Sequence, residues 1–292
     1  MQPAIEAFFD EGTSTFSYLV QDPEARIAAV IDPVLDFEPR SGHVSSGSAD
    51  RIGAALTRQQ LTLEWILETH AHADHLSAGA YLRDRHGGRI AIGEGIRDVQ
   101  KVFAALFNLG ADFPCDGSQF DCLWRDGETF RIGALDARVI ATPGHTSDSV
   151  TYLIGDAAFV GDTLFQPDYG SARCDFPGGD AGALFDSVQK LYTLPDDTRL
   201  FMCHDYPPQG RGPQYWTTVG VQKRSNVHLN AATRREPFVA MRTARDATLA
   251  SPVLFLPALQ VNIRAGRLPE PESNGRVYLK IPVNAPGSAA KA

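Results

Sequence analysis

The sequence predicts an α/β fold in which two mixed sheets pack face to face between outer helices, an αββα sandwich. Hydrophobic segments of strand length alternate along the chain with segments of helical periodicity, which is the pattern of α/β proteins. Histidine and aspartate gather where the predicted strands end, the place where ligands commonly bind in such folds. Other α/β architectures share this alternation, so the alternation alone predicts an α/β fold without selecting the two-sheet sandwich among α/β folds.

Composition narrows the class of protein. The 292 residues are 43% hydrophobic and 21% charged, which predicts a globular protein with a sizeable core. The formal net charge of −8 argues against nucleic acid and anionic membranes as partners. No apolar run could span a bilayer and residues 1–10 lack signal-peptide features, so we expect a cytoplasmic protein. The four cysteines show no CxxC spacing, which favours reduced thiols.

The N-terminal part is predicted to be rich in strands. Gly12-Thr13 separates two alternating runs, which predicts a hairpin, and Ile52, Ala55 and Leu56 recur at helical spacing. In chain order we expect a hairpin of Ile5–Phe9 and Thr15–Val20, a strand over Arg26–Ile31, a long loop over Asp36–Ser48, a helix over Ala49–Gln60 and a buried strand over Glu64–Glu68.

The middle of the chain continues the alternation of helices and strands. Gly87-Gly88 can end a helix because glycine adopts the left-handed conformation freely. The expected elements are a helix over Ser77–His86, a strand over Arg89–Ile92, a helix over Ile96–Leu109, a turn-rich segment over Cys115–Thr129, a strand over Ala137–Thr142, a hairpin of Ser149–Ile154 and Ala157–Val160, a helix over Asp180–Leu194 and a strand over Arg199–Cys203.

From Gly210 onward the alternation weakens. We expect a helix over Val221–Arg235 and an irregular, proline-rich segment over Pro252–Pro282. The chain therefore divides into one domain of residues 1–240 and an irregular C-terminal extension, 241–292, that packs on the same domain. Its small-residue tail, from about residue 286, is predicted to be disordered.

Four polar positions carry the candidate chemistry. Three of the eight histidines fall within residues 70–75, in the run Thr69-His70-Ala71-His72-Ala73-Asp74-His75 between a predicted strand and a predicted helix. His145, Asp162 and His204 each follow a further predicted strand. A polar surface loop or a hydrogen-bonded structural histidine would explain each position alone. Four together favour a metal site, and imidazole with carboxylate suits Zn, Fe or Mn.

These motifs, with Pro143-Gly144-His145-Thr146 and Gly161-Asp162, resemble the metallo-β-lactamase-fold superfamily over roughly the first two thirds of the chain. The resemblance implies a metallo-β-lactamase-like catalytic domain in residues 1–240. In the two-metal hydrolases of that superfamily, such as glyoxalase II, residues matching His70, His72 and His145 hold the first metal, residues matching Asp74, His75 and His204 hold the second, and the residue matching Asp162 bridges them.

A narrower resemblance is to the persulfide dioxygenases, also called sulfur dioxygenases, in their bacterial form without a fused rhodanese domain. It is carried by the segments Gly170–Phe176, His204–Tyr206, Gln222–Arg224, Leu259–Leu268 and Tyr278–Ile281. This resemblance implies one Fe(II) per chain held by His70, His145 and Asp162, with zinc as an alternative or adventitious metal. Under this resemblance, four further residues either support the iron ligands or bind a second metal: His72, Asp74, His75 and His204.

The same resemblance places Arg173, Tyr206 and Arg224 along the site for glutathione persulfide and implies a homodimer. Surface ion pairs are the alternative role for the two arginines. Asp205 is expected to hold a ligand imidazole in its tautomer, a role that metal-binding histidines usually require.

Three classes of function compete. Two histidines and one carboxylate leave open positions on Fe(II) for substrate and O2, whereas a two-zinc hydrolase needs a bridging hydroxide. We expect a non-haem Fe(II) dioxygenase that oxidises glutathione persulfide, or a related low-molecular-weight persulfide, with O2 to sulfite and the thiol in sulfide detoxification. The alternative enzyme is a binuclear zinc hydrolase of glutathione thioesters or lactones. A non-catalytic binding protein is disfavoured because no ligand of the motif is lost.

Overall fold

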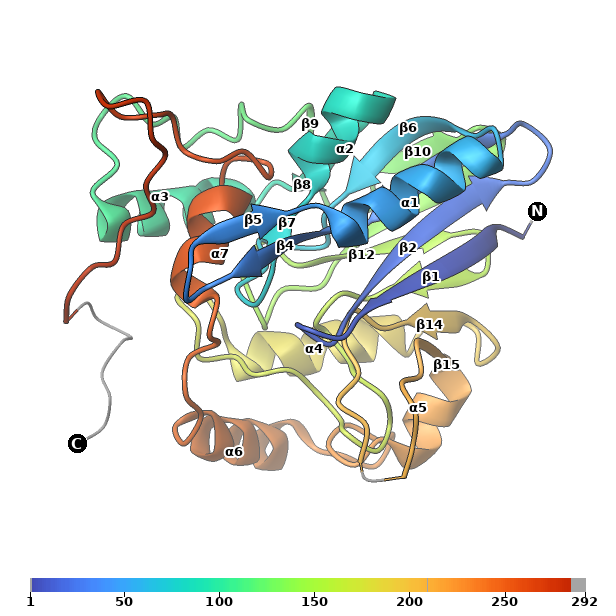
Figure 1. The fold of residues 1–292 in the computed structure, drawn as a ribbon. Helices are drawn as coiled ribbons and strands as arrows, with labels where there is room; N and C mark the ends of the chain where they lie inside the picture. Colours follow the sequence, from blue (N-terminus) through green and yellow to red (C-terminus); the bar gives the residue numbers. More distant parts are fainter. Residues whose placement is uncertain (1, 209, 285–292) are drawn as a thin grey trace.

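The computed structural model describes residues 2–208 and 210–284, and it shows two six-stranded sheets packed face to face between helices (Figure 1). The predicted αββα sandwich is therefore confirmed. Within the described residues, no helix is long and apolar enough to cross a membrane.

The first sheet is built from the N-terminal part of the chain. In sheet order its strands are β1 (Ala4–Asp10), β2 (Thr15–Asp22), β3 (Ile27–Ile31), β6 (Thr62–Leu67), β8 (Arg89–Gly93) and β9 (Cys122–Trp124). β1, β2 and β3 pair antiparallel, whereas β3, β6, β8 and β9 run parallel. The parallel strands end at one edge of the sheet, and the loop that follows β6 carries the histidine cluster.

The second sheet follows in the chain and is mostly antiparallel. In sheet order it contains β10 (Thr129–Ile132), β11 (Leu135–Ala141), β12 (Val150–Ile154), β13 (Ala157–Phe159), β14 (Arg199–Phe201) and β15 (Trp216–Thr218). Only the pair of β13 and β14 is parallel within this sheet. A short third sheet has the order β5 (His43–Ser45), β4 (Val34–Glu38) and β7 (Leu76–Ser77).

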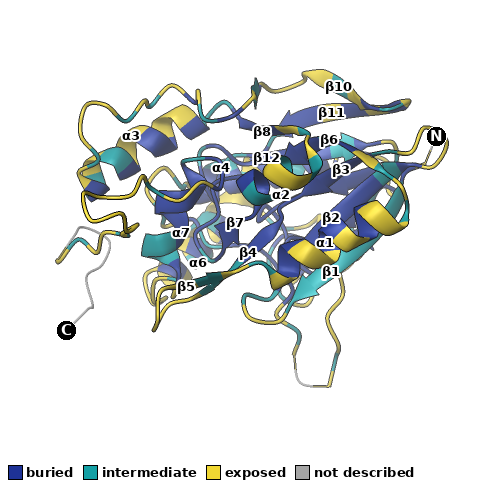
Figure 2. Cartoon of the chain, turned by 45° about the horizontal axis from the view of Figure 1, so that its top comes forward, coloured by how far each residue is buried: buried dark blue, intermediate teal, exposed yellow. Residues whose placement is uncertain are grey.

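Helices cover both outer faces of the sandwich (Figure 1). The first sheet is covered by α1 (Gly47–Arg58), α2 (Gly79–His86), α3 (Ile96–Phe107) and α7 (Phe255–Asn262), and the second by α4 (Ala181–Leu191), α5 (Val219–Ser225) and α6 (Arg235–Asp246). Figure 2 shows α1 buried along one side and exposed along the other, as its amphipathic spacing predicts.

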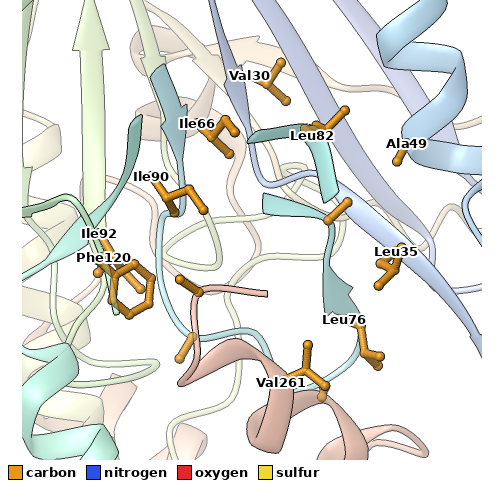
Figure 3. Packing of buried hydrophobic residues seen from close by; sticks show 14 of the residues in the cluster. Val30, Leu35, Ala49, Ile66, Leu76, Leu82, Ile90, Ile92, Phe120 and Val261 are labelled. Atoms are coloured by element: carbon orange, nitrogen blue, oxygen red, sulfur yellow. The ribbon is translucent and has the colours of Figure 1, made fainter. Parts of the chain in front are cut away.

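The core has one layer between the sheets and one under each helical layer. Tyr18, Trp65 and Tyr152 lie in the layer between the sheets. Under α1, α2 and α7, side chains of β3, β6 and β8 form a continuous apolar layer (Figure 3). Each large apolar side chain buried in these layers contributes about 1.5–3 kcal/mol, so the layers fix the strand ends relative to one another.

Two segments predicted as loops contain strands. The prediction of one long loop over Asp36–Ser48 is wrong, because most of β4 and all of β5 form a hairpin there. The Asp36 carboxylate accepts the backbone N–H of Ser48 at 2.9 Å and its hydroxyl at 2.7 Å, which ties the hairpin to the start of α1. The turn-rich segment Cys115–Thr129 contains β9, whose Trp124 packs on Trp65.

The predicted helix over Val221–Arg235 is also wrong in its extent. α5 ends at Ser225 because Asn226 adopts an extended conformation, and its side-chain oxygen accepts the backbone N–H groups of His228 and Leu229, each at 2.8 Å. A separate helix, α6, begins at Arg235.

The C-terminal extension is more regular than predicted. The expectation of an irregular segment over Pro252–Pro282 is wrong for α7, whose residues Ala258–Asn262 are buried against the first sheet. The predicted boundary at residue 240 falls inside α6, so the extension shares a helix with the part before it. The tail from residue 286 lies outside the described residues.

Candidate metal centre

The two sheets bring their histidines and aspartates together because the preceding strands run in compatible directions. β11 and β13 are both antiparallel to β12, and β14 is parallel to β13, so these three strands end at one edge. His145, Asp162 and His204 follow them there. Opposite, the loop after β6 supplies His70, whose donor atom lies within 4.8 Å of those of His145 and Asp162.

The first donor group consists of His70, His145 and Asp162. Nδ1 of His70 lies 3.1 Å from the Thr69 hydroxyl, and Nδ1 of His145 lies 2.7 Å from the backbone carbonyl oxygen of Arg173. Nε2 is therefore the atom that each imidazole presents to the centre. Oδ2 of Asp162 lies 3.5 Å from Nε2 of His145, so one carboxylate oxygen completes the group.

The loop of residues 69–75 supplies most of a second donor group. Donor atoms of His72, Asp74 and His75 lie within 4.8 Å of one another. Nε2 of His72 lies 2.9 Å from a carboxylate oxygen of Asp32, which leaves Nδ1 facing the centre. Nδ1 of His75 lies 3.2 Å from the carbonyl oxygen of Leu76, so Nε2 of His75 is the atom that faces the centre.

His204 joins the second donor group to the first. Its Nδ1 lies 3.2 Å from the carbonyl oxygen of Ser14. Its Nε2 lies 3.1 Å from Oδ2 of Asp74 and 3.4 Å from Oδ1 of Asp162. Asp162 thus faces His145 with one oxygen and His204 with the other, the position of a shared ligand.

The chemistry of this cluster fits a metal ion. Among the described residues, several of its buried nitrogen and oxygen atoms have no hydrogen-bond partner, although such atoms are costly to leave unpaired. They are Nε2 of His70, Nδ1 of His72, Nε2 of His75, Nε2 of His204, Oδ2 of Asp74 and Oδ1 of Asp162. Imidazole nitrogens and carboxylate oxygens that converge without partners are the donors that Zn, Fe and Mn accept.

Two buried carboxylates hold the loop of residues 69–75 in place. Asp32, at the end of β3, accepts the backbone N–H of Thr69 at 2.7 Å and its hydroxyl at 2.8 Å. Asp148, just before β12, accepts the backbone N–H of Ala71 at 2.8 Å. Both sheets therefore anchor the same loop, one through each aspartate.

A glycine lets the two ligand-bearing strand ends approach each other. Gly161, next to Asp162, has a φ of +52°, and a Cβ atom there would lie 2.6 Å from the Thr69 hydroxyl oxygen. Glycine adopts this left-handed conformation without the steric penalty of other residues. Its missing side chain is what allows Thr69, beside His70, to lie against the backbone beside Asp162.

Burial and nearby charges set the protonation of the imidazoles. Burial, reinforced by neighbouring histidines, lowers the pKa of His70 well below its ordinary value. Burial and His72 together lower the pKa of His75 to about 4, so both rings are neutral, as ligands must be. Burial opposes the charge of His72, but the Asp32 carboxylate outweighs it and raises the pKa of that imidazole to about 10.

Tyr206 lies beside the second donor group. Its ring is stacked on that of His204, with ring centroids 5.8 Å apart and an interplanar angle of 14°, and it also contacts Phe165. Burial raises the pKa of Tyr206 well above its ordinary value, so the phenol stays protonated. The residue is still 37% exposed, so its surface can meet a ligand.

The two arginines predicted to contact substrate are placed differently. Arg173 forms a two-pronged ion pair with Asp175, at 2.6 and 2.8 Å, and donates to the carbonyl oxygen of Ala250 at 2.6 Å. Its carbonyl oxygen, not its guanidinium, faces the centre through His145. Arg224 is exposed in the last turn of α5, and no contact recorded for the described residues joins it to the donor cluster.

A cleft lies beside the donor cluster. Its volume is about 1230 Å³, and its walls come from the β4–β5 hairpin and the segments 173–177, 246–257 and 277–281. Phe176 belongs to that wall, and its ring centroid lies 5.3 Å from that of His145. The cleft therefore neighbours the centre without containing its donors.

The loop that orients His145 is held from α6. Arg242 is buried and forms an ion pair with Asp246, and Asp246 accepts the backbone N–H of Cys174 at 2.7 Å. Arg242 also donates to the carbonyl oxygen of Ser171 at 3.2 Å. These contacts lie on either side of Arg173 and fix the carbonyl group that meets Nδ1 of His145.

Sequence reasoning missed several supporting residues. The expected role of Asp205 is wrong: its carboxylate pairs with Arg211 at 2.6 and 2.8 Å, while Nδ1 of His204 meets the Ser14 carbonyl. Asp32 and Asp148 were not among the residues predicted to belong to the site. Their position just after β3 and just before β12 was the available signal, since polar residues at strand ends also mark the histidines.

A buried cluster of histidines and aspartates at the strand ends of an αββα sandwich defines a metal-binding protein. The family description "Metallo-beta-lactamase superfamily" matches residues 10–204. The chain belongs to the metallo-beta-lactamase superfamily.

Two of the relatives carry the names of a metallo-hydrolase and a glyoxylase, and a third carries the name of a persulfide dioxygenase. It is 54% identical over 291 residues to a "probable metallo-hydrolase" of Burkholderia pseudomallei, covering 96% of this chain and 99% of that protein. It is 48% identical to "Glyoxylase B2" of Dictyostelium discoideum, covering 96% and 97%. It is 33% identical to human mitochondrial "persulfide dioxygenase ETHE1", covering 90% and 88%.

A solved structure also carries the name ETHE1. The crystal structure of ETHE1 from Myxococcus xanthus is 32% identical and has a TM-score of 0.72, covering 90% of this chain and all of that one. The chain also spans 66% of a longer relative, the "beta-lactamase hydrolase-like protein" of Xylella fastidiosa, at 52% identity.

Proposed function

We propose that the protein is a non-haem Fe(II) dioxygenase that oxidises glutathione persulfide, or a related low-molecular-weight persulfide. The observation that carries the proposal is the convergence of His70, His145 and Asp162, all buried, at one point. Two imidazoles and one carboxylate are the ligand set of non-haem Fe(II) oxygenases. The likeness to persulfide dioxygenases over 90% of the chain supports this reading.

The proposed reaction balances without a side-chain nucleophile. One persulfide, one O2 and one water give one thiol, one sulfite and two protons. The sulfur–sulfur bond breaks, three sulfur–oxygen bonds are present in the product, and O2 takes four electrons from the terminal sulfur. A bound Fe(II) supplies open coordination positions and the one-electron chemistry that O2 needs.

The protein would hold and shield this chemistry. The Arg173 carbonyl fixes the tautomer of His145, and the Thr69 hydroxyl positions His70. The rings of Phe176 and Tyr206 lie against His145 and His204 and limit the access of water. In this proposal Arg173, Tyr206 and Arg224 contact the substrate. Of the three side chains, that of Tyr206 lies against the donor cluster, through its contact with His204.

A two-metal hydrolase of glutathione thioesters or lactones is the second candidate. The second donor group favours it, since Asp74, His75 and His204 keep unpartnered donor atoms and Asp162 faces both groups. The names of the Burkholderia and Dictyostelium relatives also favour it. In this reading a hydroxide between two zinc ions would be the nucleophile.

Metal analysis and two activity assays on one preparation distinguish the candidates. Protein purified without O2 would be loaded with Fe(II) or with Zn(II), and the metal per chain measured. Each form would then be tested for O2 uptake with glutathione persulfide and for hydrolysis of a glutathione thioester. The His145→Ala variant is the matched control for metal that binds elsewhere.

We expect about one Fe(II) per chain, O2 uptake with sulfite formed in equal amount, and no thioester hydrolysis. Two Zn(II) per chain with thioester hydrolysis and no O2 uptake would overturn the dioxygenase proposal in favour of the hydrolase.

A further inference from the structure

We propose that Asn262, near the C-terminal end of the described chain, is a positioning residue of the metal centre. The inference rests on the metal centre of the proposed function but not on which reaction it supports. Asn262 is the last residue of α7 and lies outside the segment 10–204 that the superfamily description matches.

The side-chain hydrogen bonds of Asn262 go to the loop of residues 69–75, which carries ligands, and to Ser77 just after it. Its amide nitrogen donates to the backbone carbonyl oxygens of His72 and His75, each at 2.8 Å. Its amide oxygen accepts the backbone N–H of Ser77 at 2.8 Å. One side chain therefore uses both amide hydrogens and its oxygen to fix the backbone on either side of Asp74.

Burial makes these hydrogen bonds demanding. Asn262 is 4% exposed, and the residues that it contacts are buried as well. A buried backbone carbonyl that loses its donor pays the full cost of desolvation, so the loop would move to recover a partner. Movement of those carbonyls would rotate the adjoining imidazoles away from the metal.

The backbone after Asn262 approaches the same loop closely. Gly266 has a φ of +83°, and a Cβ atom there would lie 2.8 Å from the carbonyl oxygen of Ser77 and 3.1 Å from the backbone nitrogen of Gly79. The buried residues Val261 and Ala265 lie in the same apolar layer as Leu76. The segment 261–266 thus packs against the residues just after the loop, and Asn262 makes the polar contacts to the loop itself.

The helix α7 offers a matched control two residues away. Gln260 is also buried, and its side chain also makes three hydrogen bonds, to the carbonyl oxygens of Leu256 and Lys280 and from the backbone N–H of Lys280. None of these partners lies in the ligand loop. Asn262→Ala and Gln260→Ala therefore remove similar buried contacts from one helix, but only the first removes contacts to the centre.

The test measures the rate at which Fe(II) and Zn(II), loaded separately, pass from the protein to a chromophoric chelator, together with the thermal midpoint of the metal-free protein. Partners of metal ligands typically change metal affinity 10- to 100-fold when removed. We expect Asn262→Ala to accelerate release of both metals at least about tenfold, and Gln260→Ala to leave it within about twofold, with similar midpoints.

Asn262→Asp keeps the size of the side chain and its acceptor for Ser77 but removes the donors to His72 and His75. We expect it to accelerate metal release as much as Asn262→Ala, and it provides the readout if the alanine variant does not fold. Equal release from the Asn262 and Gln260 variants, or wild-type release from Asn262→Asp, would overturn the proposal. Either result would leave the choice between dioxygenase and hydrolase untouched.

Discussion

The two donor groups of the centre differ in what holds them when no metal is bound. In the second group, His72 lies 2.9 Å from Asp32 and His204 lies 3.1 Å from Asp74, so two of its three imidazoles have a carboxylate at ion-pair distance. In the first group, Nε2 of His145 lies 3.5 Å from Asp162, but Nε2 of His70 has no hydrogen-bond partner within the described residues, and burial keeps that ring neutral.

This difference indicates which group depends on a metal. An imidazolium paired with a carboxylate has its charge balanced, whereas an unpaired buried imidazole gains most from a metal cation. His72 can therefore persist as an ion pair with Asp32 without a metal, whereas His70 has no such partner. This asymmetry supports a metal ion at His70, which the dioxygenase proposal needs.

The largest expected effect belongs to the residue that the two groups share. Asp162→Ala removes the oxygen that faces His145 and the one that faces His204. We expect metal content to fall below detection and activity to fall at least about a thousandfold, equal to about 4 kcal/mol of transition-state stabilisation. Metal analysis and O2 uptake with glutathione persulfide would measure both. Retention of one metal per chain would show that Asp162 is not a ligand.

The next comparison removes one imidazole from each group. We expect His145→Ala to lower O2 uptake at least about a hundredfold, and His75→Ala to lower it less than about tenfold, because only His145 belongs to the first group. Both rates would be measured at saturating persulfide, with metal content determined for each variant. Equal losses would mean that both groups bind metal, as the hydrolase requires.

Much of the site follows from the sequence because its ligands stand directly after strands with clear hydrophobic patterns. β6, β11, β13 and β14 were all expected close to their observed positions, and the direction of each strand then carries the ligands to a common edge. Residue type and position at the strand ends marked His70, His145 and Asp162 as candidates, and the resemblance to the persulfide dioxygenases grouped them as one ligand set.

What holds those ligands could not be read in the same way. Asn262 lies 190 positions from His72, and no local pattern links the two. β9 has three residues and is placed by the packing of Trp124 on Trp65, a contact between distant segments. A strand of that length shows no periodicity, so only the assembled sheet reveals it.

A smaller effect is expected at the carboxylate that supports both groups. Asp32→Asn keeps the shape of the side chain but loses an acceptor that serves Thr69 or His72. We expect metal affinity, measured by competition with a chelator, to fall about tenfold. Asp36→Asn is the control, since Asp36 makes comparable bonds to Ser48 away from the centre. An equal loss in both variants would assign the effect to general destabilisation.

The smallest expected effect lies outside both groups, at the proposed substrate residue Arg224. A charge-assisted hydrogen bond to an anionic substrate contributes about 1.5–3 kcal/mol. Because Arg224 is exposed, we expect Arg224→Ala to lower kcat/KM by about tenfold, through KM and without change in metal content. Lys223→Ala, at a neighbour that pairs with Asp196, is the control. Unchanged kinetics in Arg224→Ala would remove the residue from the substrate site.

The absent side chain at Gly161 has a wider consequence. Because a methyl group there would meet Thr69 from the other sheet at 2.6 Å, it would act as a wedge between the two halves of the sandwich. The resulting displacement would separate Asp162 from His70 although no coordinating side chain and no charge had been removed. Metal binding by this protein therefore also depends on how closely its two sheets approach each other at Gly161.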